Sequence, residues 1–236
     1  SFKNVVTFNL DEYYPISHKD SESYHYFMDK YLFSQIDIPR ENINVPSGEI
    51  GKEEVTKFCQ EYEEKIEREG GIDLQILGIG RTGHIGFNEP PSPEKSITRM
   101  VYLHRLTRQD AANSFQGIQN VPKCAITMGI DTISKARKII IMAWSENKST
   151  IVHKSIEGEK CNENPSTFLH DHKDATFYLD LPAGEKLTRF NLPWTIKGDY
   201  EDPQVPRTKF WIIKSVLWLS NVVKKPLLRL SFEDYE

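Results

Sequence analysis

The chain has 236 residues, of which 38% are hydrophobic and 11% aromatic, enough for one domain with a buried core and a connecting segment. Its formal net charge of −4 at pH 7 gives no reason to expect nucleic acid or an anionic membrane as a partner. An anionic ligand therefore needs a local cationic site.

The cysteines and the apolar segments indicate the cellular compartment. Cys59, Cys124 and Cys161 are widely spaced and form no CxxC pair, which argues against a disulfide framework or a zinc ribbon. The apolar run Phe210–Leu219 is too short to span a bilayer, and no signal peptide is visible. We therefore expect a cytoplasmic protein with reduced thiols.

Short apolar segments alternate with amphipathic segments up to about residue 190. Strands are predicted at residues 4–8, 73–80, 125–128, 138–144 and 175–180. Helices are predicted to begin at Asp20 or Ser21, to cover 55–66, to begin at Ser145, and to cover 165–172. The alternation predicts an α/β fold, a doubly wound and mostly parallel sheet of Rossmann-like type with helices on both faces.

The composition changes beyond residue 190. Residues 191–207 are rich in proline and polar groups and are predicted to be a linker, and one more helix is predicted over Phe210–Val223. The sequence thus divides into an α/β domain, residues 1–190, and a C-terminal segment, residues 191–236, that leads towards a further domain.

Ligands of open α/β sheets bind at the carboxyl ends of the strands, and two carboxylates follow the first predicted strand. Asp11 and Glu12 come directly after the run NVVTFNL. A carboxylate that is partly desolvated there has a raised pKa and can act as a base. The alternative is a turn or a helix cap.

The strand at 73–80 runs into a glycine-rich turn. Gly78, Gly80 and Gly83 match the dinucleotide fingerprint, but the prolines in PPSP (90–93) exclude the long helix which that site requires. The loop instead presents His84 and Glu89, a pair suited to proton transfer if His84 is not merely structural. Neither this pair nor His170-x-His172 has the spacing of a metal site.

Ser145 and Lys148 follow the strand at 138–144. Ser145 is predicted to cap a helix whose free N–H groups, together with the Lys148 ammonium, form a phosphate site. A solvated lysine is the alternative.

Taken together, these segments resemble the glucosamine-6-phosphate deaminase family. FNLDEY (8–13), the block GxGxxGHIGFNEP (78–90), VPKCAITMGI (121–130) and the SxxK after a strand carry the resemblance from residue 1 to about 190. The wider group includes 6-phosphogluconolactonases, whose histidine motif lacks the FNEP continuation.

The resemblance implies that glucosamine 6-phosphate and water are converted to fructose 6-phosphate and ammonia, a hydrolase and isomerase activity without metal or organic cofactor. Asp11 would move the proton between C2 and C1, His84 would open the ring with Glu89 orienting it, and Lys148 would hold the phosphate. Glu12, Gly83 and Asn88 would shape the pocket. The substrate class is a phosphorylated amino sugar, and the family commonly forms homo-oligomers.

The sequence departs from the family in its functional residues. Thr82 replaces the aspartate that normally stands two residues before the histidine. Phe115 lies near the position of the phosphate-binding arginine of the family's lid, so Arg108 is the candidate substitute. Of the basic pair for the allosteric activator, Arg99 is present and Val101 replaces the lysine.

The first strands and the phosphate loop of the family are missing before residue 1, so we expect a fragment of a longer protein, in which a deacetylase-like domain can follow. Two alternatives to the deaminase remain open: an isomerase or lactonase for another hexose phosphate, and a degenerate domain that senses sugar phosphate without turnover.

Overall fold

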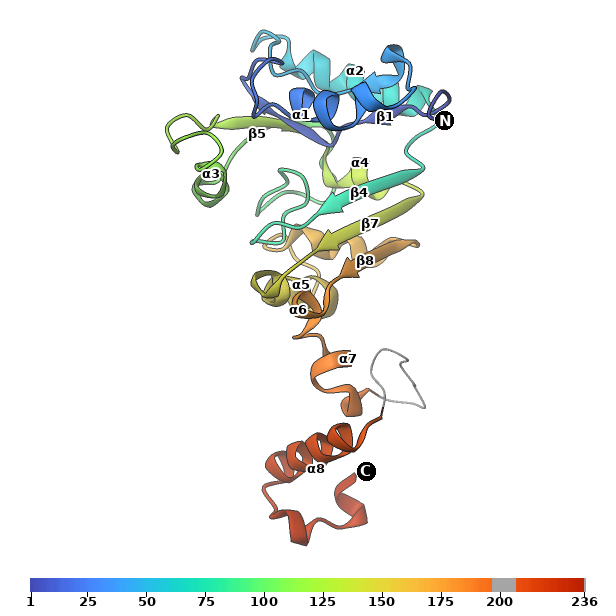
Figure 1. Cartoon of the computed structure of the whole chain (residues 1–236), viewed down its shortest axis with the longest axis vertical. Helices are drawn as coiled ribbons and strands as arrows, with labels where there is room; N and C mark the ends of the chain where they lie inside the picture. Colours follow the sequence, from blue (N-terminus) through green and yellow to red (C-terminus); the bar gives the residue numbers. More distant parts are fainter. Residues whose placement is uncertain (197–206, 236) are drawn as a thin grey trace.

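A computed structural model describes residues 1–196 and 207–235. It has an α/β part at one end and the C-terminal helix at the other (Figure 1). The strands are β1 (Thr7–Phe8), β2 (Asp11–Tyr14), β3 (Ile43–Asn44), β4 (Leu74–Gly78), β5 (Arg99–Tyr102), β6 (Cys124–Thr127), β7 (Lys138–Ala143) and β8 (Ala175–Leu179). The α-helices are α1 (Tyr24–Tyr31), α2 (Val55–Arg68), α3 (Arg105–Ala111), α4 (Ile130–Ser134), α5 (Ser149–Glu157), α6 (Leu181–Gly184), α7 (Thr188–Asn191) and α8 (Lys209–Val223).

Short 3₁₀ helices complete the chain within the described residues. They cover Phe33–Gln35, Arg40–Asn42, Glu146–Lys148, Pro165–Asp171, Pro193–Thr195, Leu227–Arg229 and Phe232–Tyr235. The helix predicted at 165–172 is thus a 3₁₀ helix.

The strands form separate parallel and antiparallel sheets. β4, β7 and β8 form a parallel sheet in that order, and β1 pairs with β3 in parallel. β2, β6 and β5 form an antiparallel sheet. The α/β class with parallel sheets is therefore confirmed, whereas the antiparallel sheet was not predicted. β2 and β5 read DEYY and RMVY, which show neither an apolar run nor a regular alternation.

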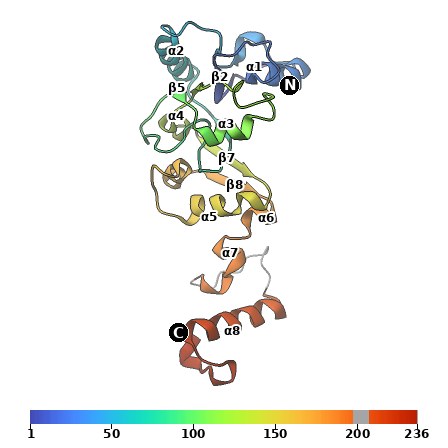
Figure 2. The same ribbon diagram turned by 90° about the vertical axis from the view of Figure 1, so that its left-hand side faces the viewer.

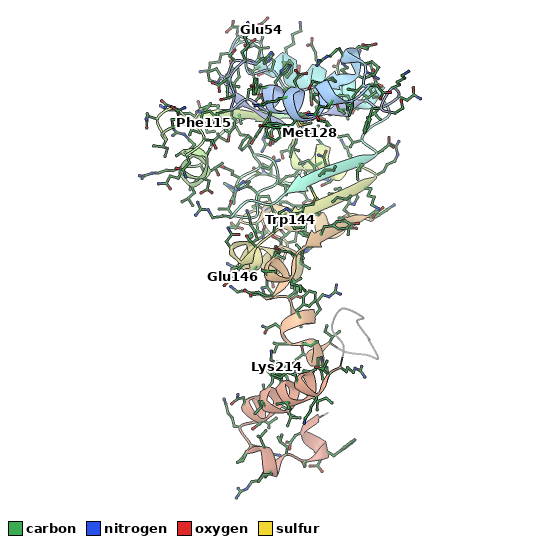
Figure 3. All side chains as sticks on the ribbon, viewed as in Figure 1. Glu54, Phe115, Met128, Trp144, Glu146 and Lys214 are labelled. Carbon is green, nitrogen blue, oxygen red and sulfur yellow. The ribbon has the colours of Figure 1, made fainter. Side chains whose placement is uncertain are left out.

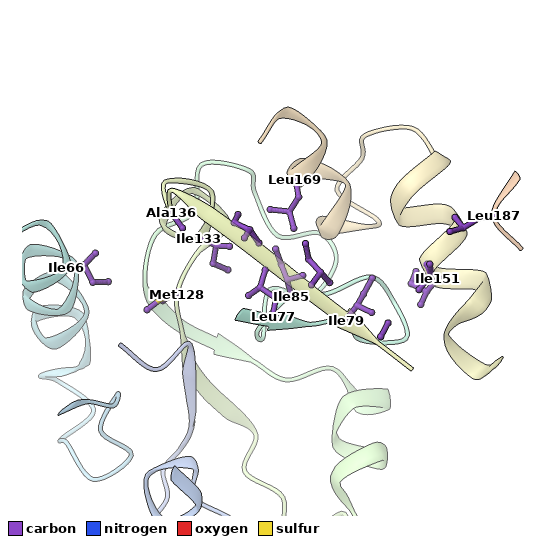
Figure 4. Close-up of a cluster of buried hydrophobic side chains, with 14 of the residues drawn as sticks. Ile66, Leu77, Ile79, Ile85, Met128, Ile133, Ala136, Ile151, Leu169 and Leu187 are labelled. Carbon is purple, nitrogen blue, oxygen red and sulfur yellow. The ribbon is translucent and has the colours of Figure 1, made fainter. Parts of the chain in front are cut away.

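The main core lies on one face of the parallel sheet. Ile139 and Ile141 of β7 and Leu77 of β4 are at most 1% exposed and pack with side chains from α4 and α5 (Figure 4). Burying each such side chain stabilises the fold by about 1.5–3 kcal/mol. The alternate positions Ile76 and Met142, on the other face, are 53% and 37% exposed.

Two helices flank the sheets at the start of the chain and illustrate how the local sequence determines their limits. α2 buries Val55, Cys59, Tyr62 and Ile66, which recur at helical spacing as predicted. α1 begins later than predicted, because Ser23 is its N-cap and its hydroxyl accepts a hydrogen bond from the Tyr26 N–H at 3.3 Å.

The C-terminal segment contributes little to the α/β core. Figure 2 shows α8 beyond α7, away from β8 and α5. Trp194 contacts Trp211 and Trp218 of α8, with ring centroids 5.7 and 6.3 Å apart. Most of the linker predicted at 191–207 lies outside the described residues. Among the helices that are described, none is long and apolar enough to cross a membrane.

Candidate active site

Asp11 is the first residue of β2, opposite Thr127 of β6. Among the described residues, none forms a hydrogen bond or ion pair with its carboxylate. Although part of the residue is accessible to solvent, protein surrounds the carboxyl group closely enough for burial to raise its pKa to about 7, with the Glu12 charge as a smaller cause. Asp11 therefore has the pKa of a base that works near neutral pH.

Glu12 has the opposite environment, although it is the next residue. It is fully buried, and its carboxylate accepts hydrogen bonds from the N–H groups of Tyr13 (2.9 Å), Tyr24 (3.0 Å) and His25 (2.9 Å) and from the Ser23 hydroxyl (2.8 Å). Three of these donors lie at the beginning of α1, where N–H groups lack helical partners. Glu12 thus holds the beginning of α1 against β2, the strand that carries Asp11.

The glycine-rich loop after β4 folds so that the His84 ring lies against backbone. The Gly80 N–H donates to the His84 carbonyl at 2.9 Å, and a Cβ at Gly80 would lie 1.9 Å from the His84 ring. Gly83 has a φ of +77°, and a Cβ there would lie 1.7 Å from the Asn164 side chain. Both positions therefore require glycine.

The side chain of His84 has Thr82 as its hydrogen-bond partner. The distance between Thr82 Oγ1 and His84 Nδ1 is 3.0 Å. Burial lowers the pKa of His84, the Glu89 charge opposes this shift, and the Lys148 charge adds to it. The imidazole is therefore poised as a neutral base rather than as a fixed cation.

Glu89 does not hydrogen-bond to His84 in this structure. Its Oε2 accepts from the His104 N–H at 2.5 Å, while Oε1 is buried with no partner among the described residues. Glu89 acts on His84 through its charge, and the expectation that it orients the ring stays a prediction. A surface groove lined by Glu89, Val101 and His104, among others, borders this side of the site.

Asn88 connects the histidine loop to the strand that carries Asp11. The Asn88 amide donates to the carbonyls of Ile85 (2.9 Å) and Met128 (2.8 Å). The Met128 N–H in turn donates to the Leu10 carbonyl at 2.8 Å. Met128 thus joins the loop to the residue before Asp11, which brings the predicted base and the predicted histidine to one place.

The oxygen of the Asn88 side-chain amide is also hydrogen-bonded. Asn88 Oδ1 accepts from the Arg99 guanidinium at 2.9 Å, and Arg99 also donates to Ser92 Oγ at 3.2 Å. Asn88 and, in the same loop, Gly83 therefore stabilise the loop that carries His84. Their contact with a substrate stays a prediction.

Lys148 reaches the same loop from the turn after β7. Its ammonium donates to the Ile79 carbonyl at 2.7 Å, and burial followed by the charge of Arg81 lowers its pKa. Lys148 is therefore a partly buried cation beside the histidine loop, and its contact with an anionic ligand stays a prediction.

Ser145 stands at the N-cap position of the 3₁₀ helix Glu146–Lys148, as predicted for a helix start, but its side chain makes no capping hydrogen bond. Ser145 has a φ of +74°, and its hydroxyl donates to Asn147 Oδ1 at 2.7 Å instead of accepting from a helix N–H. The turn that contains Trp144 and Glu146 (Figure 3) therefore leads through a 3₁₀ helix, and α5 begins only at Ser149. The local sequence could not show this, because the Asp180 carboxylate, which accepts from the Ser145 N–H at 3.0 Å, fixes the backbone from a distant part of the chain.

Arg108 lies inside the segment that follows β5, residues 104–121, which we call the lid segment. Its guanidinium donates to the carbonyls of Ile118 (2.9 Å) and Val121 (3.3 Å). Phe115 packs against Tyr13 with ring centroids 5.1 Å apart. The structure thus gives Arg108 a role in holding the lid segment together, and its role in phosphate binding stays a prediction.

Two residues near the site were not singled out by the sequence. Thr127 is buried in β6, where its hydroxyl accepts from the Phe87 N–H at 3.2 Å. A polar residue within the apolar run 125–128 was the available signal. Arg81, in the glycine-rich loop, forms an ion pair with Asp110 of α3. Among the described residues, His, Cys, Asp and Glu side chains form no group of three that could hold a metal ion.

The fold is that of an α/β protein in which contacts through Asn88 and Met128 tie the His84 loop to β2, while the Lys148 ammonium contacts the same loop. The model of the family of glucosamine-6-phosphate isomerases and 6-phosphogluconolactonases matches residues 1–178, and the chain belongs to this family.

Two relatives of this chain match it over different shares of their own length. A glucosamine-6-phosphate deaminase of Thermoanaerobacter sp. is 44% identical over 77% of this chain and 71% of its own length. A glucosamine-6-phosphate deaminase-like protein of Bacteroides thetaiotaomicron is 37% identical over the whole of this chain, which spans only 34% of that relative.

Solved structures agree with the fold class. A monomeric glucosamine-6-phosphate deaminase superposes with a TM-score of 0.76 at 40% identity, over 78% of this chain and 76% of its own. A 6-phosphogluconolactonase from Trypanosoma cruzi gives a TM-score of 0.62 at 22% identity, over 78% and 73% of the two chains, and shows the fold alone. Since that deaminase is described as monomeric, the homo-oligomer expected here stays a prediction.

Proposed function

We propose that the chain converts glucosamine 6-phosphate and water to fructose 6-phosphate and ammonia. The observation that carries this proposal is the placement of Asp11, a carboxylate without a neutralising partner among the described residues and with a pKa raised to about 7, on a strand tied through Met128 to the His84 loop. The similarity to glucosamine-6-phosphate deaminases at 44% and 40% identity supports it.

His84 opens the sugar ring in this mechanism. With the Thr82 hydroxyl accepting from Nδ1–H, Nε2 is free to take the proton of the C1 hydroxyl. His84 then delivers that proton to the ring oxygen, the bond between C1 and the ring oxygen breaks, and the open-chain aldehyde forms. The lowered pKa of His84 keeps the ring neutral and able to accept the proton at pH 7.

Asp11 carries out the isomerisation. Its carboxylate removes the proton from C2, which gives an enolamine, and returns a proton to C1, which gives an imine at C2. Water adds to C2 and the amine leaves as ammonia, which forms the ketone of fructose 6-phosphate. Because the aldehyde stabilises the carbanion, a carboxylate with a pKa of about 7 is a sufficient base.

The phosphate of the substrate fixes the sugar relative to these groups. Lys148 is held against the Ile79 carbonyl at 2.7 Å, within the loop that carries His84. A phosphate bound there uses binding energy from a remote part of the substrate to position C1 and C2.

The proposal is tested by incubating the full chain with glucosamine 6-phosphate and measuring ammonia and fructose 6-phosphate, with glucose 6-phosphate and 6-phosphogluconolactone as competing substrates. Formation of both products from glucosamine 6-phosphate alone is the expected result. Turnover of another substrate would assign the site to an isomerase or lactonase. Thermal stabilisation by glucosamine 6-phosphate without product would assign it to a sensing domain.

A further inference from the structure

Two cations converge on the glycine-rich loop, and only one of them has been assigned a role so far. Lys148 donates to the Ile79 carbonyl at 2.7 Å, and Arg81 is located two residues further along the same loop. The carboxyl end of β4 points towards the side of the parallel sheet where α3 lies (Figure 1), and Arg81 follows β4 in the sequence. This is the edge where ligands bind in open α/β sheets.

The guanidinium of Arg81 is held in a fixed orientation by the lid segment. Its Nε donates to Asp110 Oδ2 at 2.9 Å, and its second nitrogen contacts Asp110 Oδ1, so the pair is bidentate. The side chains are 56% and 50% exposed, and such ion pairs contribute little to stability. Asp110 therefore orients the guanidinium without binding it strongly, and an anion with two charges can replace the carboxylate.

Two other arginines near the site, Arg99 and Arg108, already have hydrogen-bond partners, and Arg99 donates to Asn88 and Ser92. Arg108 donates to the Ile118 and Val121 carbonyls, and Phe115 packs on Tyr13. Phe115 carries no charge, and one terminal nitrogen of Arg108 is taken up by these two carbonyls, whereas its Nε is buried without a partner among the described residues. A planar guanidinium that already holds a carboxylate in bidentate geometry matches the spacing of phosphate oxygens equally well.

We propose that Arg81 is the second phosphate-binding cation of this site, beside Lys148, and that Asp110 holds its guanidinium until the substrate phosphate takes the place of the carboxylate. This inference rests on the proposed function for the identity of the substrate. It assigns to the glycine-rich loop a phosphate-binding cation in place of the family's lid arginine, near whose position this chain has Phe115.

The electrostatics of the two cations agree with this assignment. After burial, the positive charge of Arg81 is the next cause that lowers the pKa of Lys148, so the guanidinium acts directly on the ammonium. Two cations that destabilise each other are stabilised by an anion bound between them. The Asp110 carboxylate supplies one negative charge to Arg81 alone, whereas a phosphate bound between Arg81 and Lys148 supplies up to two.

The test compares Arg81→Ala and Arg81→Lys with the wild type, using glucosamine 6-phosphate and unphosphorylated glucosamine as ligands. Because a charge-assisted bidentate contact is lost, KM for glucosamine 6-phosphate should rise about 10- to 100-fold in Arg81→Ala while kcat changes little. Lysine should recover only part of this loss, since it lacks the planar fork. Kinetic parameters for glucosamine should not change.

The chain offers a matched control at the opposite end of the same sheet. Arg137 forms an exposed ion pair with Asp73 at 2.6 Å, next to the first residues of β4 and β7. Arg137→Ala removes a similar pair and should leave both KM values unchanged. Asp110→Asn releases Arg81 and should lower KM for glucosamine 6-phosphate or leave it unchanged.

Binding measurements separate this inference from the proposed function. Isothermal titration with glucosamine 6-phosphate and with inorganic phosphate should show at least tenfold weaker binding to Arg81→Ala. Weaker binding in the variant with no turnover by the wild type would retain Arg81 and reject the deaminase. Turnover by the wild type with equal binding to both proteins would reject Arg81 alone. No binding to the wild type would overturn both.

Discussion

Strand β2 and the loop at residues 80–89 bring titratable groups to the same site, and burial shifts their pKa values in opposite directions. It raises the pKa of Asp11 to about 7 and lowers the pKa of His84. Both shifts have one physical cause, because burial penalises whichever form carries the charge. In the proposed mechanism, Asp11 would be the base for carbon and His84 the neutral imidazole that acts on oxygen.

The two regions differ in how their carboxylates are satisfied. In β2, four donors surround Glu12, and Asp11 has no such partner among the described residues. In the loop, the His104 N–H binds one oxygen of Glu89, and the neutral Thr82 hydroxyl binds His84. The number of hydrogen-bond donors thus distinguishes Glu12, whose carboxylate is fully bonded, from Asp11, the proposed base, although the two are adjacent in the sequence.

The largest expected effect belongs to Asp11→Asn. Removing the base should lower kcat by at least about 10²- to 10⁴-fold, the usual contribution of general base catalysis. Release of tritium from C2 of labelled glucosamine 6-phosphate measures this step directly. Glu12→Gln is the matched control, and it should destabilise the fold by about 1–3 kcal/mol because it disturbs buried hydrogen bonds. Tritium release that persists in Asp11→Asn would exclude Asp11 as the base.

His84→Gln should have the next largest effect. Ring opening by the protein stops, but the open-chain sugar still forms slowly in solution, so we expect a loss of about 10²-fold in kcat/KM. His153→Gln is the control, since His153 is exposed and pairs with Glu157 at 3.3 Å on α5. Equal activity of His84→Gln and the wild type would mean that another group opens the ring.

The fold was predictable wherever the sequence signal is local. β4 and β7 are apolar runs, and α2 repeats its buried residues at helical spacing, so each was found near its true limits. β2, β5 and α3 have polar or mixed sequences and depend on partners far along the chain. β2, for example, exists because β6, more than 100 residues later, pairs with it.

In the candidate site, too, the residues with a local sequence signal were predictable. The glycine spacing and the FNEP block indicated His84 and Glu89, and Asp11 followed a predicted strand. Long-range contacts could not be foreseen: the Arg81 to Asp110 pair spans 29 residues. The Asp180 carboxylate that fixes Ser145 is 35 residues away.

Thr82→Asp tests the difference between a neutral and a charged partner of His84. A carboxylate at 3.0 Å from Nδ1 would favour the imidazolium and raise the pKa of His84. We expect a change in kcat of about threefold to tenfold, well below the 10⁴-fold effect of the orienting carboxylate in a serine protease triad, because Glu89 already supplies charge. An NMR titration of the His84 ring measures the shift. An unchanged His84 pKa would mean that residue 82 does not contact the ring.

The smallest expected effect is a pH dependence of stability that arises from Asp11. Its folded pKa of about 7 lies above its unfolded value of 3.8, so the folded state binds more protons between these values and loses stability as the pH rises through this range. Asp11→Asn removes this dependence. Its stability relative to the wild type should grow between pH 4 and pH 7, by about 1–2 kcal/mol once solvent screening at the partly exposed carboxyl is allowed for. Urea unfolding at several pH values measures this difference. A difference that stays constant with pH would show that Asp11 is well solvated, and a solvated carboxylate would be too weak a base for the proposed proton transfer at C2.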